Sequence, residues 1–257
     1  MGVRYHFSST CDKIPDMKTI SKKAFTHILV AAIMAIALIT MPTAIAATFP
    51  DVPSTETYYK GIQYLAGEDI VHGHPDGTFR PNTTLNRAEM MKIVAEGAAK
   101  YHGRDQTVFN DYKNESCFKD VGGGHWFTPY ICYGKAQGWV KGYSDGNFRP
   151  GQPVNFVEAL KITFMGFSIP YNEDREPWYR NAVEYASAKN YIPFTITAFG
   201  AELKRGEMAD MITRVIKADK GTAELNEYLG DRADIVVTYE TILHGADLSQ
   251  MTSETIQ

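Results

Sequence analysis

Apolar side chains recur at helical spacing in several separate stretches of the chain, divided by polar, turn-rich segments. In the stretch from about Glu56 to Glu68, Ile62 and Leu65 stand three positions apart, which places them on one face of a helix. A second stripe begins at Met90. The pattern predicts an all-α protein made of helix–loop–helix units with irregular connections.

The connection between the two helices recurs 69 residues further on without a gap. Residues 70–89 read IVHGHPDGTFRPNTTLNRAE, and residues 139–158 read WVKGYSDGNFRPGQPVNFVE. The Asp-Gly pair in each copy predicts a tight turn, because glycine takes a positive φ without steric penalty. We expect Arg80 and Arg149, which follow these turns, to brace them. Tandem units of this kind bury their apolar stripes against each other.

The second helix of each unit has a clear start signal. Asn86 can act as an N-cap, and Glu89 three positions later completes a capping box. Asn155 and Glu158 repeat the arrangement. Capping alone explains why these glutamates recur, and it stands as the alternative to ligand contact.

A third, degenerate unit follows. Its closing tetrapeptide, Lys204 to Glu207, resembles the ends of the first two units, but its Asp-Gly turn is missing. The predicted units are residues 49–101, 118–168 and 174–217, with a polar surface linker at 102–117 and a tail at 218–257. The apolar residues of the tail predict one more packed helix.

The N-terminal residues predict a secretory signal peptide at 1–46. Lys22 and Lys23 precede an apolar run, and Ala44-Ile45-Ala46 offers a cleavage site. A membrane-spanning helix is the alternative, but the run is short for a span, so we expect none after cleavage. The chain from Met17 is a complete leader by itself, and we expect translation to start there.

The net charge bears on which partners the chain can bind, and the cysteines bear on whether a disulfide can form after export. Residues 47–257 hold 21 basic and 28 acidic side chains, a net charge of −7, which disfavours nucleic acid as a partner. Cys117 and Cys132 remain after cleavage. Export permits a disulfide between them, which would close a loop of about 15 residues. Two buried free thiols are the alternative.

The repeated unit resembles the S-layer homology domain. The resemblance rests on FPDV at residues 49–52, on GHPDGTFRP at 73–81, and on Asn-Arg-Ala-Glu at 86–89, where the family has Thr-Arg-Ala-Glu. It implies three units packed as a pseudo-threefold bundle with grooves between them. It also implies a non-catalytic anchor at the cell wall or cell surface. Such domains bind a cell-wall polysaccharide that is acidic and commonly pyruvylated, or a peptidoglycan-linked glycan. A structural or protein-interaction component of the envelope or S-layer without glycan binding is the alternative.

The resemblance also implies which residues bind the glycan. They are Trp126 and Trp178, Gly73 and Gly142, and Arg87 and Arg205. Arginine suits an acidic sugar because its planar guanidinium pairs with a carboxylate, and free amides at a helix start favour anions. Solvated surface arginines with no ligand are the alternative. Phe156 replaces the arginine in the second unit and Thr57 the tryptophan in the first. We therefore expect unequal grooves, each drawing on two units.

Catalysis and cofactors are not expected. Glu89 and Asp76 could suggest a wall hydrolase with paired carboxylates, but the same acids recur in the second unit at capping and turn positions. The sequence has no G-x-S-x-G or H-E-x-x-H motif. His72 and His74 do not recur in the second unit, which weakens a metal site there. We expect cell-wall polysaccharide and other envelope proteins as the partners.

Overall fold

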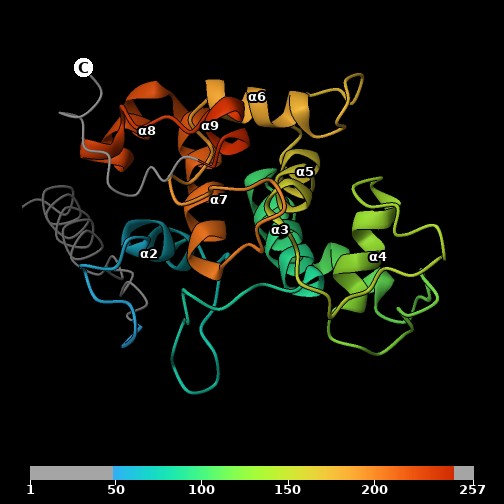
Figure 1. Ribbon diagram of the computed structural model, residues 1–257. Helices are drawn as coiled ribbons and strands as arrows, with labels where there is room; N and C mark the ends of the chain where they lie inside the picture. The colour runs from blue at the N-terminus through green and yellow to red at the C-terminus, as the bar shows by residue number, and fades with distance from the viewer. Residues whose placement is uncertain (1–48, 246–257) are drawn as a thin grey trace, which may run out of the picture. The chain divides into compact units, whose positions relative to one another are not determined.

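The computed structural model describes residues 49–245, so the predicted signal peptide at 1–46 lies outside the described residues. The described chain forms α2 (Tyr59–Gly67), α3 (Arg87–Tyr101), the 3-10 helix η2 (Gln106–Tyr112), α4 (Thr128–Ala136), α5 (Phe156–Gly166), α6 (Arg180–Ala188), α7 (Arg205–Lys220), α8 (Thr222–Leu229), the 3-10 helix η3 (Gly230–Arg232) and α9 (Tyr239–Leu243) (Figure 1). Within these residues β-pairing is limited to isolated bridges. The prediction of an all-α fold is therefore confirmed.

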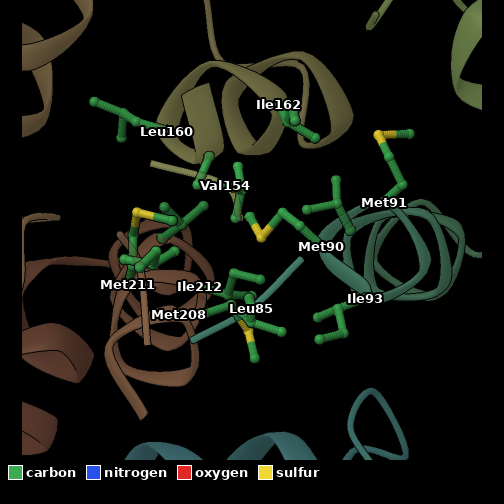
Figure 2. Close-up of a cluster of buried hydrophobic side chains, with 14 of the residues drawn as sticks. Leu85, Met90, Met91, Ile93, Val154, Leu160, Ile162, Met208, Met211 and Ile212 are labelled. Atoms are coloured by element: carbon green, nitrogen blue, oxygen red, sulfur yellow. The ribbon is translucent and has the colours of Figure 1, made fainter. Parts of the chain in front are cut away.

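Three extended segments, one before each of α3, α5 and α7, meet in a closed ring of backbone hydrogen bonds. Leu85 N–H donates to Leu203 O at 2.9 Å, Leu203 N–H to Val154 O at 2.9 Å, and Val154 N–H to Leu85 O at 3.0 Å. All three side chains are fully buried. Figure 2 shows Leu85 and Val154 among apolar side chains of the three helices. The ring gives the three segments equivalent environments.

Each of these helices begins on the connection of a neighbouring unit. The first helical amides donate as follows: Arg87 N–H to Gln152 O at 2.9 Å, Phe156 N–H to Ala201 O at 2.8 Å, and Arg205 N–H to Thr83 O at 3.0 Å. The helix of the first unit is thus anchored on the second, that of the second on the third, and that of the third on the first. These bonds also satisfy amides that have no partner within their own helix.

The aspartate of the FPDV segment fastens the turn of its own unit. The Asp51 carboxylate accepts hydrogen bonds from Phe79 N–H at 2.8 Å and from Arg80 N–H at 2.6 Å. Asp120 makes the corresponding two bonds in the second unit, both at 2.7 Å. The FPDV segment reads FKDV at residues 118–121 of the second unit, and this clamp explains why its aspartate recurs together with the turn.

The second helices begin where the sequence predicts, but the first helices do not. Both capping boxes, at Asn86 and at Asn155, are present. The helix expected from Glu56 begins at Tyr59 instead, because the residues before it form turns closed by short-range backbone bonds. In the second unit, Trp126 likewise lies in the turn before α4 and not in the helix.

The segment predicted to be a polar linker is partly packed. It contains η2, whose Phe109 is buried and lies 5.1 Å from the Tyr130 ring and 5.0 Å from the Tyr133 ring, centroid to centroid. A disulfide joins Cys117, at the end of the segment, to Cys132 on α4. Phe109, Tyr112 and the disulfide together dock this polar segment on α4.

The described part of the tail, residues 218–245, holds the α-helices α8 and α9, where the sequence predicted one more helix. Leu225, Tyr228 and Leu229 of α8 form a small buried cluster apart from the main core. In this part of the chain, as in the rest of residues 49–245, no helix is both long and apolar enough to cross a membrane.

Candidate functional site

The six residues proposed for glycan binding, two arginines, two tryptophans and two glycines, line two surface pockets. Groove A, with a volume of about 600 Å³, is lined by Gly73, Trp126 and Arg205 among others. Groove B, of about 270 Å³, is lined by Arg87, Gly142 and Trp178 among others. Each groove thus takes its arginine, its glycine and its tryptophan from three different predicted units. The expected combination of two units is present, because each helix start is anchored on its neighbour's turn and so brings the arginine and the glycine together, and the remaining unit adds the tryptophan.

The arginine of groove B is held in place by its surroundings. Arg87 Nε–H donates to Phe148 O at 2.9 Å, and its Cζ lies 4.6 Å from the centroid of the Phe148 ring. Its Nη1 is 3.5 Å from the Glu158 carboxylate. The residue is 6% exposed, so the alternative of a solvated surface arginine is wrong.

The arginine of groove A has the same arrangement on the turn of the first unit. Arg205 Nε–H donates to Phe79 O at 2.8 Å, and its Cζ is 4.6 Å from the centroid of the Phe79 ring. A second guanidinium N–H donates to His72 O at 3.1 Å. Burial lowers the pKa of Arg205, but an arginine remains charged at neutral pH. Two arginines from different helices therefore occupy equivalent, pre-ordered positions.

The tryptophans differ in exposure. Trp126 is 55% exposed at the edge of groove A. Trp178 is partly buried, and Lys161 Nζ lies 5.0 Å from the centroid of its ring. An indole face in such a position suits an apolar face of a sugar ring, because it offers area with little side-chain freedom to lose.

The two glycines have a packing role that the sequence did not reveal. A Cβ on Gly73 would lie 2.8 Å from Phe49 Cε1 and 3.0 Å from Thr78 O. A Cβ on Gly142 would lie 2.5 Å from Phe118 Cε1, and its φ of +74° already favours glycine. Glycine therefore lets the FPDV phenylalanine pack behind the groove wall.

Sequence reasoning missed two lysines. Lys92 lines groove A and Lys161 lines groove B, one turn after the capping glutamates. They stand 69 residues apart, so the repeat offset would have found them. In groove B, Arg87, Lys141 and Lys161 outnumber the one acid, Glu158. In groove A, the cations Lys92 and Arg205 are balanced by Glu89 and Glu96. Groove B is the more cationic of the two.

A third junction between units lies where the helix start of the second unit meets the third unit, and Phe156 stands there in place of the arginine. Side chains of the protein occupy this junction. Tyr58 is buried there against Gly206, and its hydroxyl is 2.7 Å from Thr195 Oγ1. Burial raises the pKa of Tyr58, which remains a neutral phenol. Thr195 Oγ1 donates in turn to Glu207 at 3.1 Å.

The tail packs at the same junction through α8. Asp210 stands in α7 where the first two units have the groove lysines, and it pairs with Arg214 at 2.9 Å. Tyr228 of α8 donates its hydroxyl proton to Asp210 Oδ1 at 2.5 Å. Asp210, Arg214 and Tyr228 are all buried. The position that carries a groove lysine elsewhere is here part of a buried network.

The turn arginines brace their turns, as predicted. Arg80 Nη2 lies 2.6 Å from Asp76 Oδ2, and Arg149 Nη2 lies 3.0 Å from Asp145 Oδ2. The Asn147 backbone amide, together with Arg149, lowers the pKa of Asp145 to about 2. These carboxylates are held as turn braces.

The acids considered for catalysis have structural partners. Glu89 Oε2 accepts from Asn86 N–H at 3.0 Å, so this carboxylate caps α3. Asp76 is the partner of Arg80 described above. Across residues 49–245 no group of three or more His, Cys, Asp or Glu side chains could hold a metal ion.

Comparison with known proteins identifies the repeated unit. Residues 48–91 and 118–160 match the S-layer homology domain family. A cellulosome-anchoring protein of Acetivibrio thermocellus is 31% identical over 115 residues, which cover 45% of this chain and 25% of that protein. An S-layer protein of Bacillus anthracis is 26% identical over 230 residues, covering 75% of this chain and 26% of that protein. A middle cell wall protein of Brevibacillus brevis is 25% identical over 187 residues, covering 72% and 16%. The chain therefore spans about a quarter of the length of these relatives, or less.

Proposed function

Because residues 48–91 and 118–160 belong to the S-layer homology domain family, we propose that this chain holds its protein on the cell envelope by binding an acidic cell-wall polysaccharide in grooves A and B. The chain is a cell-surface anchoring module, and its relatives are named for S-layers, cell walls and cellulosome anchoring. The binding is non-covalent and non-catalytic. The polysaccharide carries carboxylates, as a pyruvylated sugar does.

The observation that carries the proposal is the repeated convergence of arginine, lysine and tryptophan from three units. Arg87, Lys161 and Trp178 line one groove, and their counterparts line the other. A guanidinium fixed by a carbonyl and an aromatic ring loses little freedom when it pairs with a carboxylate. The first two amides of α3 donate to carbonyls of the second unit, so the free amides expected at this helix start are occupied and the charge of Arg87 itself attracts the anion.

The charge of groove B supports an anionic ligand. Residues 47–257 have a net charge of −7, so general attraction for anions is absent. Groove B nevertheless gathers three cations around one acid. A local cationic site on an acidic chain favours a specific acidic ligand over non-specific adsorption.

Wall binding tests the proposal directly. Full-length exported protein is mixed with native wall sacculi, and with sacculi from which acid extraction has removed the polysaccharide. We expect co-sedimentation with the native sacculi and its loss with the extracted ones, and we expect the extracted polysaccharide to compete. Equal binding to both preparations would contradict the proposal and favour an envelope component that binds protein or bare peptidoglycan.

A further inference from the structure

A second pocket adjoins groove A on the surface between α3, η2 and α4. It has a volume of about 590 Å³ and shares two lining residues, His72 and Glu96, with groove A. The volume of each falls within the range of about 300–1,000 Å³ that is usual for small-ligand sites. Two pockets that share a wall can hold neighbouring units of one chain molecule.

The second pocket exists because of the segment inserted between the first two units. Residues 102–117 contribute much of its lining, including Arg104, Gln106 and Lys113. Only five residues, 169–173, separate the second predicted unit from the third. The equivalent of Glu96 beside groove B, 69 residues on, is Met165. Groove B therefore lacks both elements that build this pocket.

The pocket's charges are balanced. Its lining includes three cations, Lys100, Arg104 and Lys113, and three acids, Asp69, Glu96 and Asp105. Such a surface offers donors and acceptors without a net charge. Groove A is balanced too, but its Arg205 is fixed by a carbonyl and a ring for pairing with a carboxylate, whereas Lys100 of this pocket is already paired with Glu68. The pocket therefore suits a neutral polyhydroxy ligand better than a second acidic group.

Glu96 supplies an acceptor at the boundary of the two pockets. Its Oε1 accepts from the Tyr130 hydroxyl at 2.9 Å and lies 3.8 Å from Lys92 Nζ. Its Oε2 is buried and has no hydrogen-bond partner in the protein. An unsatisfied buried carboxylate oxygen is costly, so a carboxylate that turns into the pocket and accepts a sugar hydroxyl gains the partner that it lacks. Burial also raises the pKa of Glu96.

We propose that this pocket, subsite A2, binds a neutral sugar unit next to the acidic sugar held in groove A. The inference rests on the proposed function. A hydroxyl of the neutral sugar donates to the Glu96 carboxylate once that carboxylate turns toward the pocket, and the lysine and arginine side chains donate to the oxygens of the sugar. Groove A therefore recognises a longer stretch of the polysaccharide than groove B does.

Calorimetry with glycan fragments of two lengths tests subsite A2. The ligands are the single acidic sugar and a fragment that adds its neutral neighbour, each titrated into the full-length chain with Trp178→Ala to weaken groove B. We expect the longer fragment to bind more tightly. In that background Glu96→Met, which copies Met165, lowers the ratio of the affinity for the longer fragment to that for the single sugar about tenfold. The ratio is the readout because Glu96 also lines groove A.

Lys113→Ala serves as a second variant, because this exposed side chain can be shortened without disturbing the core. We expect it to weaken the longer fragment about threefold. Subsite A2 is overturned if the chain that carries Trp178→Ala alone binds both fragments with equal affinity. It is also overturned if neither Glu96→Met nor Lys113→Ala weakens binding of the longer fragment. If the parent binds neither fragment, the proposed function itself fails, so the two failures are distinguishable.

Discussion

Arg87 and Arg205 show how one residue can serve both the fold and the ligand. Each places its Nε–H on a backbone carbonyl of another unit and its plane over a phenylalanine ring. Each also lines a groove. The sequence pointed to these residues through their place in the repeat. It could not reveal their burial, because that depends on contacts between units far apart in the chain.

Arg87→Ala is expected to weaken glycan binding about 10- to 150-fold, since a charge-assisted hydrogen bond contributes about 1.5–3 kcal/mol. Arg205→Ala should act similarly at groove A. Arg87→Lys keeps the charge and loses the planar fork, so we expect an intermediate affinity. Calorimetry with extracted wall glycan measures these effects, with melting curves to check folding.

Arg80→Ala is the matched control for Arg87, because Arg80 braces a turn and does not line groove B. We expect its affinity for the glycan to stay near that of the parent, with the change appearing in stability. Parent-like binding by folded Arg87→Ala and Arg205→Ala would show that the arginines serve the fold alone.

Asp51 is expected to matter for stability rather than for binding. Its carboxylate accepts two backbone amides of the turn, one of them from the buried Phe79. Asp51→Ala should lower the free energy of unfolding by about 2–3 kcal/mol, and Asp51→Asn by less, because one acceptor oxygen remains. Urea denaturation measures both. Asp51→Ala unfolding at the same urea concentration as the parent would contradict the clamp.

At the level of elements, the sequence predicted best where a signal is local. The capping boxes at Asn86 and Asn155 depend on side chains three residues apart, and both are present. The start of α2 was predicted three residues early, because the turns before it resemble a helix start in composition. Phe109 gave no periodic signal, so the packing of η2 could not be foreseen.

The disulfide between Cys117 and Cys132 ties the inserted segment to α4. Closing a loop of about 15 residues contributes roughly 3 kcal/mol in the chain-entropy description. The double variant Cys117→Ala, Cys132→Ala should therefore lose about that much stability in denaturant. Non-reducing peptide mapping of protein from the envelope should find the two cysteines linked. Two alkylatable thiols would rule the bridge out in the native protein.

At the scale of the whole molecule, the threefold arrangement of helix starts is regular but the junctions are not. The repeat and its departures, above all Phe156, predicted that the grooves would be unequal. The sequence could not predict that Tyr58 and the tail occupy the third junction. The tail reaches this junction through α8, which has no counterpart in the repeat. Its Tyr228 donates a hydrogen bond to Asp210 of α7.

We therefore expect two glycan sites per chain, with groove B tighter for the single acidic sugar because its cations are in excess. Tyr228→Phe removes a buried hydrogen bond to Asp210, which then lacks one partner. It should lower the free energy of unfolding by about 1–3 kcal/mol.

The number of sites should not change in that variant, because Phe156 leaves the third junction without an arginine and Tyr58 still fills it. Calorimetric titration of parent and Tyr228→Phe with the single acidic sugar, alongside urea denaturation, measures both quantities. A third site in the parent would mean that the junction opens in solution. A third site only in Tyr228→Phe would mean that the tail, rather than the missing arginine and Tyr58, is what keeps the glycan out.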